Sequence, residues 1–345
     1  MNPVLVLLSI TVIWVLLPMI PALRELFRPE DLKPIQLTDR SVGKISFFAR
    51  NFRQYLDRVL PPEAGAGDYA ARLLDDTQFV RVNRKSDQLA GKGEIEQRLV
   101  VIDSPLTLAG GQTFAMEVYA REKLSSGPET NYRALYGELE LDLGENTRVF
   151  RWAHARGTLT VGSHSVLRGR ASSDRRVVLG RDVVFERLSA PVIGCGATRE
   201  PPPLSRPATK WSPPPGSRVL GDCLRVEGDL DLPRESLVPG NLVVTGRLRI
   251  GAGSLVEGSV KAHGDLELAD RARVGGAAIT RGRLALSEQA WIGGPAVAEH
   301  SVRLGRDSVV GGPSLPASVC GAEVELSEGA TVYGQISATR GARTL

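Results

Sequence analysis

Pairs of aliphatic residues recur along the C-terminal third of the chain at a nearly constant spacing. The series begins with Leu230/Leu232 and continues at 18-residue steps with Leu248/Ile250, Leu266/Leu268, Leu284/Leu286 and Val302/Leu304, before Val324/Leu326 follows after 22 residues. The members of a pair lie two positions apart, so both point to the same face of a β-strand. Repeats of this length predict a solenoid in which every repeat forms one coil and stacks on its neighbour.

Each repeat contains further inward positions, and these fall at six-residue intervals. A small residue lies six positions after the start of each copy, and an aliphatic residue follows two positions later. Three short strands joined by three corners account for 18 residues, which predicts a triangular parallel β-helix. In all six copies a glycine lies two positions after this aliphatic residue. Glycine suits a corner because it tolerates positive φ and close backbone approach. These glycines are Gly240, Gly258, Gly276, Gly294, Gly312 and Gly334.

The same spacing is present upstream, at Leu141/Leu143, Leu159/Val161 and Val177/Leu179, with a fainter copy at Leu106/Leu108. The sequence therefore predicts an all-β protein of about nine or ten coils with ~18 residues per coil. Residues 191–218 interrupt the array with a proline-rich segment that cannot form a coil side, because proline lacks the backbone N–H. This segment is interpreted as a looped-out insertion or a linker between two stacks, with Trp211 as a candidate anchor.

The N-terminal segment has a different character. Residues 3–23 contain no charged side chain, and about 20 apolar residues suffice to cross a bilayer as a helix. A cleaved signal peptide is disfavoured because a basic n-region and an A-x-A site are both missing. We therefore expect an uncleaved single-pass anchor. All the nearby basic residues follow it, so the positive-inside rule places the solenoid in the cytoplasm.

Residues 42–60 show a helical stripe of apolar positions accompanied by basic residues. Two interpretations remain open for this helix. It lies on anionic lipid beside the anchor, in which case Lys44, Arg50, Arg53 and Arg58 contact the membrane surface. Alternatively, it caps the end of the following domain. The expected organisation is an anchor at 1–27, a juxtamembrane segment at 28–62, an N-terminal region with a first stack at 63–190, the linker at 191–218 and a second solenoid at 219–340.

Composition narrows the functional classes. The chain has 345 residues, 37 glycines, 18 aromatic residues and a net charge of +4. Glycine is too sparse for collagen, and the hydrophobic content is too high for wholesale disorder. The small charge and few aromatic residues argue against a nucleic-acid partner. Three cysteines far apart form neither a disulfide framework nor a zinc site.

Candidate catalytic groups are scarce. His263 and His300 lie about two coils apart, and no metal-binding or acid–base cluster accompanies them. No nucleophile elbow, phosphate-binding loop or dinucleotide fingerprint is present. The sequence therefore predicts neither a cofactor nor a metal site, and a protein that is not an enzyme.

The segments at 228–276 and 324–336 resemble the repeat of bactofilins, a family of polymer-forming cytoskeletal proteins; the stretch that matches best is about 222–338, and residues 137–190 match more loosely. The resemblance implies a bacterial protein whose β-helix core assembles end to end without bound nucleotide. It further implies a scaffold at the inner membrane that self-associates, or co-assembles with a related protein, to organise envelope-related machinery.

The terminal coils of a solenoid also expose unpaired backbone unless they are capped. We therefore assign a candidate assembly interface to the last coil, at Val324, Leu326, Val332 and Ile336. Two alternatives remain. A hexapeptide-repeat acyltransferase also has triangular coils, with His263 as its candidate catalytic residue, and an accessory subunit of polysaccharide synthesis or export need not polymerise.

Overall fold

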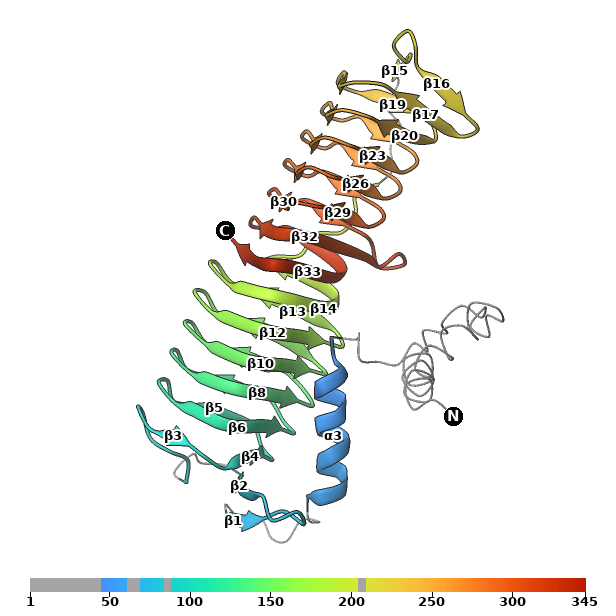
Figure 1. The fold of residues 1–345 in the computed structure, drawn as a ribbon. Coiled ribbons are helices and arrows are strands. Elements are labelled where there is room, and N and C mark those ends of the chain that lie inside the picture. The colour runs from blue at the N-terminus through green and yellow to red at the C-terminus, as the bar shows by residue number, and fades with distance from the viewer. Residues whose placement is uncertain (1–44, 61–68, 84–87, 204–208) are drawn as a thin grey trace, which may run out of the picture. The chain divides into compact units, whose positions relative to one another are not determined.

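The computed structural model describes residues 45–60, 69–83, 88–203 and 209–345, all within one compact unit that extends from Lys44 to Leu345. It contains one helix, α3 (Phe47–Val59), and 33 strands in a single continuous sheet (Figure 1).

The strands form two stacks. The first consists of β1 (Tyr69–Arg72), β2 (Gln78–Val82), β3 (Ile95–Glu96), β4 (Leu99–Ile102), β5 (Leu106–Leu108), β6 (Thr113–Ala120), β7 (Leu124–Ser126), β8 (Asn131–Gly137), β9 (Leu141–Leu143), β10 (Arg148–Ala155), β11 (Thr158–Val161), β12 (Val166–Ser173), β13 (Arg176–Leu179) and β14 (Val184–Cys195). The second consists of β15 (Thr209–Lys210), β16 (Arg218–Leu220), β17 (Cys223–Val226), β18 (Leu230–Leu232), β19 (Ser236–Val238), β20 (Asn241–Val244), β21 (Leu248–Ile250), β22 (Leu255–Val256), β23 (Val260–Ala262), β24 (Leu266–Leu268), β25 (Arg273–Val274), β26 (Ala278–Thr280), β27 (Leu284–Leu286), β28 (Trp291–Ile292), β29 (Ala296–Ala298), β30 (Ser301–Leu304), β31 (Val309–Val310), β32 (Ala317–Leu326) and β33 (Thr331–Thr344).

The predicted parallel β-solenoid is confirmed. Strands β18, β19 and β20 pair in parallel with β21, β22 and β23 of the next coil, so each turn has three sides. Equivalent residues stack directly, as Leu230 on Leu248 and Leu248 on Leu266. The aliphatic pairs of the repeat are therefore buried ladders within one core that continues through both stacks.

The number of coils was underestimated, because the solenoid has about 14 turns. The missed turns lie upstream, where the spacing is irregular. Leu106 stacks on Leu124 and Leu124 on Leu141, so successive steps are 18 and 17 residues. Phe79 stacks on Leu99 after 20 residues. A single skipped residue shifts every later position out of phase, which conceals these turns from a search at constant spacing.

The corner glycines act mainly through close approach between coils. A Cβ atom on Gly258 would lie 2.5 Å from the carbonyl oxygen of Gly240, and neither Gly258 nor Gly276 has positive φ. Two of the six corner glycines, Gly240 and Gly334, do have positive φ. Left-handed backbone is more regular at another corner, which is occupied mostly by residues other than glycine. These residues are Glu129, Asn146, His164, Asp182, Glu235, Arg271, Gln289 and Asp307.

The two stacks run in opposite directions and meet at their C-terminal coils (Figure 1). Strand β33 pairs antiparallel with β14, so that Ile336 lies beside Leu188 and Val332 lies beside Ile193. We call this pairing of β14 with β33 the junction. The chain leaves the first stack at the junction, passes to the far end of the second stack and then coils back.

The proline-rich linker runs along the second stack as it makes this passage. The backbone N–H of Arg199 donates a hydrogen bond to the Thr331 hydroxyl, and the Arg199 guanidinium donates one to the Asp307 carboxylate. The Arg273 guanidinium donates a hydrogen bond to the carbonyl oxygen of Pro203. Strand β15 then pairs with β19 near the start of the stack. Proline is tolerated in this segment because side-chain and carbonyl contacts hold most of it against the stack. Few of its residues have to donate a backbone N–H to a β-ladder. Trp211 is half-buried and packs against the core.

Candidate functional site

Helix α3 lies along one side of the first stack rather than at its end (Figure 1). Its buried residues Ala49 and Leu56 pack with Tyr119, Tyr136 and Trp152 in a cluster separate from the solenoid core. The Phe52 ring lies 5.4 Å from the Trp152 ring. The first stack therefore occupies the apolar face of the amphipathic helix, and that face is not available to lipid in this arrangement.

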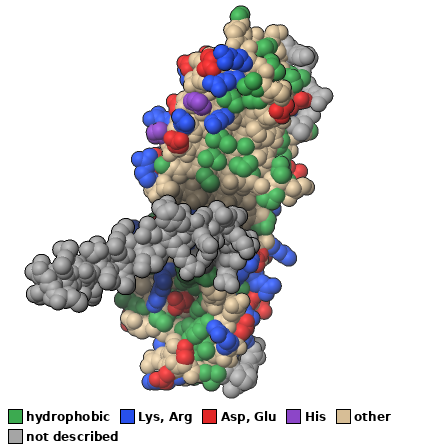
Figure 2. Space-filling view, turned by 45° about the vertical axis from the view of Figure 1, so that its right-hand side comes forward, with side chains coloured by type: hydrophobic (Ala, Val, Ile, Leu, Met, Phe, Trp, Pro, Cys, Tyr) green, Lys and Arg blue, Asp and Glu red, His purple; other side chains and the backbone are tan. Residues whose placement is uncertain are grey.

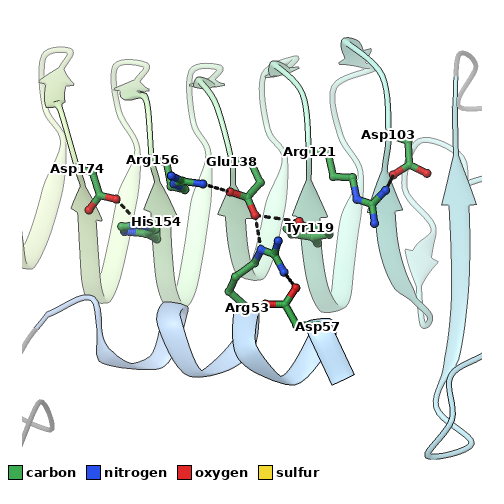
Figure 3. A network of polar contacts seen from close by, with 9 residues as sticks. All are labelled: Arg53, Asp57, Asp103, Tyr119, Arg121, Glu138, His154, Arg156 and Asp174. Carbon is green, nitrogen blue, oxygen red and sulfur yellow. Dashed lines mark hydrogen bonds and ion pairs between the residues drawn. The ribbon is translucent and has the colours of Figure 1, made fainter. Parts of the chain in front are cut away.

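A polar network joins α3 to the strands beneath it (Figure 3). Glu138 is at its centre: Arg53 of the helix and Arg156 both form ion pairs with its carboxylate, and the Tyr119 hydroxyl donates to it at 2.9 Å. Burial opposes ionisation of Glu138, but these hydrogen bonds outweigh it and lower the pKa of the carboxyl. Burial raises the pKa of Tyr119 to about 12, so its hydroxyl remains a donor.

The predicted membrane-surface residues therefore have different positions. Arg53 faces the solenoid and also pairs with Asp57 within the helix. Arg50 and Arg58 are exposed, whereas Lys44 lies outside the described residues. The prediction that these side chains form one lipid-facing set is corrected for Arg53, because its guanidinium neutralises Glu138.

His154, Ser172 and Asp174 lie together beside this network. The Nδ1 atom of His154 is 2.8 Å from the Ser172 hydroxyl, and its Nε2 atom is 3.8 Å from the Asp174 carboxylate. His154 and Ser172 are only 2% and 3% exposed. Burial lowers the pKa of His154. Because both partners are almost completely buried, we interpret this contact as a structural hydrogen bond.

The other histidines do not converge. His164 lies 3.4 Å from Asp182 at the surface, and His300 is bonded to the carbonyl oxygen of Arg281. His263 is half-buried, and its side chain forms no hydrogen bond or ion pair with another described residue. Within the same part of the chain, no group of three or more His, Cys, Asp or Glu side chains could hold a metal ion.

The candidate assembly residues are buried at the junction. Val324 and Leu326 belong to β32, whereas Val332 and Ile336 belong to β33, and none is more than 1% exposed. Since β14 of the same chain covers the last coil, the location predicted for contact with a second molecule is corrected. The sequence could not reveal this contact, because the paired segments are separated by the whole second stack.

A shallow groove of about 580 Å³ lies beside the junction. Hydroxyl groups dominate its polar lining, and the start of α3 contributes Ser46 and Arg50. Ser172 and Ser189 line it from the first stack, whereas Ser318 lines it from the second. Among the described residues that line the groove, no serine hydroxyl is hydrogen-bonded to an exposed histidine; the partner of Ser172, His154, is buried.

The far end of the second stack is more hydrophobic. Strand β16 is the outermost strand there, and its recorded pairing is to β17 in an antiparallel hairpin. Val219 and Leu220 of β16 are 70% and 61% exposed. A cavity of about 400 Å³ beside them is lined by Trp211, Leu224 and other mostly apolar residues. The exposure of this end was not predicted from the sequence. The aliphatic pair Val219/Leu220, which lies in a segment rich in proline and glycine, is the signal that indicates it.

The opposite end, at the start of the first stack, is more polar. Strand β1 pairs with β2 in an antiparallel hairpin, and Arg72 forms an ion pair with Asp76 in the connecting turn. Asp75 of the same turn accepts a hydrogen bond from Tyr55. The two ends thus share an antiparallel edge strand but differ in the side chains of that strand and its turn. Elsewhere near both ends, charged and hydrophobic side chains occur together (Figure 2).

No helix among the described residues is long and apolar enough to cross a membrane. The predicted anchor at residues 3–23 lies outside the described residues. Comparison with family models, curated proteins and solved structures finds no match to this chain.

Proposed function

We propose that the protein is a scaffold of the bactofilin type that self-associates through the free end of its second stack. The observation that carries this proposal is the exposed edge strand β16, with Val219 and Leu220 beside an apolar cavity. An edge strand has unpaired backbone groups that favour pairing with another chain. We further propose that residues 3–23 anchor the scaffold in the cytoplasmic membrane, with the solenoid in the cytoplasm.

The junction supports this mode of association. It already shows that two solenoid ends of this chain join by antiparallel strand pairing that also buries aliphatic residues, such as Ile336 against Leu188. The same geometry between two β16 strands would give a two-fold symmetric contact, in which both copies present the same surface. Charged residues at the β1 end make that end a weaker contact surface.

Sedimentation of residues 44–345 over a range of concentrations tests the proposal, with negative-stain microscopy of the largest species. We expect an end-to-end dimer for the native sequence and a monomer for Val219→Asp with Leu220→Asp. Leu315→Asp is the matched control, since Leu315 is 57% exposed on another loop. A native protein that stays monomeric at high concentration, or a double variant that assembles normally, overturns the proposal.

A further inference from the structure

The last three coils of the first stack carry a concentration of arginine around one corner, where the strands bend between Val149 and Trp152 and between Leu167 and Arg170. Residues 148–152, 166–170 and 184–187 contain five arginines and a single acidic residue, Glu186. These segments occupy equivalent positions in successive coils, since β10 pairs with β12 and β12 with β14. We call four of these residues, Arg148, Arg151, Arg168 and Arg187, together with Phe150, the arginine face.

Within the described part of the chain, no acidic side chain forms a salt bridge that would neutralise the positive charge of this face. All four of its arginines are exposed, and among the described residues none of them forms a salt bridge. By contrast, six of the twelve exposed arginines described in the second stack form salt bridges, as Arg249 does with Glu267 and Arg303 with Glu325. Basic side chains that lack an internal partner are suited to an external anion.

Exposed apolar side chains accompany these arginines. Phe150 is 50% exposed and Val184 is 45% exposed, although both belong to strands that also contribute side chains to the core. Phe48, at the start of α3, is 44% exposed and lies 5.0 Å from the Arg170 guanidinium. Arginine combined with exposed aromatic rings is the composition of surfaces that bind at the headgroup level of a bilayer.

We propose that the arginine face binds an anionic lipid surface. The inference goes beyond the proposed function, because it assigns membrane contact to the solenoid itself and does not require self-association. It also replaces the lipid contact first expected of α3, whose apolar face is buried. Charge complementarity favours a bilayer with anionic headgroups, and Phe150 supplies an apolar group that can enter the interface.

The first described residues of the chain, at the start of α3, lie beside the arginine face. Phe48 adjoins the face through Arg170, so the chain that precedes α3 joins the unit beside it. Twenty-one residues separate Leu23, the last residue of the uncharged segment, from Ile45, and such a segment reaches at most about 75 Å. An anchored chain can therefore bring the arginine face to the same membrane.

Vesicle co-sedimentation of residues 44–345 tests the proposal. The probes are vesicles of phosphatidylcholine alone and vesicles that contain phosphatidylcholine and phosphatidylglycerol at about two to one. We expect binding to the anionic vesicles only, and its loss in about 0.5 M salt, where the charges are screened within a few ångströms. Each arginine near an anionic surface contributes roughly a factor of five, so replacing all four by glutamine lowers partitioning more than about a hundredfold.

Two further variants separate charge from folding. Lysine at the same four positions retains the charge and is expected to retain binding. Phe150→Ala is expected to weaken binding while leaving its salt dependence unchanged. The matched control replaces four exposed arginines of the second stack by glutamine, namely Arg234, Arg281, Arg283 and Arg306.

Several results overturn the proposal. These are equal binding to neutral vesicles, no binding by the native sequence, or the same loss in the control variant as in the glutamine variant. Binding to duplex DNA or an acidic protein in preference to the vesicles would also overturn it. Because vesicle binding is measured on monomer or dimer alike, failure here leaves the association through β16 untouched.

Discussion

Replacing Leu56 by alanine tests directly whether packing on the solenoid holds α3 in place. Leu56 is 1% exposed and lies in the same hydrophobic cluster as Phe79, Leu99 and Val101. Truncating such a leucine costs about 2–5 kcal/mol, which includes the cavity that remains. A helix of 13 residues is marginal in water by itself, so this loss is expected to release α3 locally.

Hydrogen exchange measures the effect residue by residue. Amides within Phe47–Val59 are expected to exchange at least about thirtyfold faster in Leu56→Ala, which corresponds to the lower limit of about 2 kcal/mol. Amides of the second stack should keep their protection, since the hydrophobic cluster that contains Leu56 is built from α3 and the first stack. The control is Leu74→Ala, the same substitution at a side chain that is 78% exposed, for which we expect almost no change.

Two outcomes would refute the reasoning. Unchanged protection of α3 in Leu56→Ala would show that this side chain does not secure the helix. Equal loss of protection in Leu56→Ala and Leu74→Ala would show that burial does not determine the response.

Three further predictions concern single groups. Burial lowers the pKa of His154, so the neutral imidazole is favoured in the folded state. The stability that His154 contributes is therefore complete above its unfolded pKa of about 6.5 and is lost as the pH falls below that value. His154→Gln should remove the corresponding pH dependence of hydrogen exchange in α3. Burial raises the pKa of Cys195 to about 11, so maleimide should label the half-buried Cys223 long before Cys195 under native conditions. Ile336→Asp places a charge inside the junction and should lower the melting temperature by several degrees, whereas Ile279→Asp, at a residue 42% exposed, should change it little.

The repeat could be recognised because it is local information. Leu248 and Ile250 lie two positions apart, and each stacks on a residue 18 positions away, so the strand, its inward face and its neighbour are all written in the spacing. Upstream, the step from Leu124 to Leu141 is one residue shorter. That deviation is enough to hide a coil from the sequence, while strand pairing accommodates it with a local irregularity.

The candidate site was less accessible for a related reason. The stripe of α3 correctly predicted an amphipathic helix, but an apolar face looks the same whether lipid or protein covers it. The choice depended on aromatic residues such as Tyr136 and Trp152, which lie about 80–100 positions further along the chain. Glu138 likewise acquires its meaning from Arg53, which no motif connects to it.

The sequence by itself determined the parallel solenoid and its three-sided coil, because both follow from the order of neighbouring residues. Tertiary structure alone decided that the second stack returns to meet the first, so that β14 covers β33. It also decided that the free ends are β1 and β16 rather than the last coil. The physical reason is that every coil end of a solenoid offers similar backbone edges and aliphatic residues. Their sequence shows that an end needs a partner, whereas only the path of the chain determines which partner it meets.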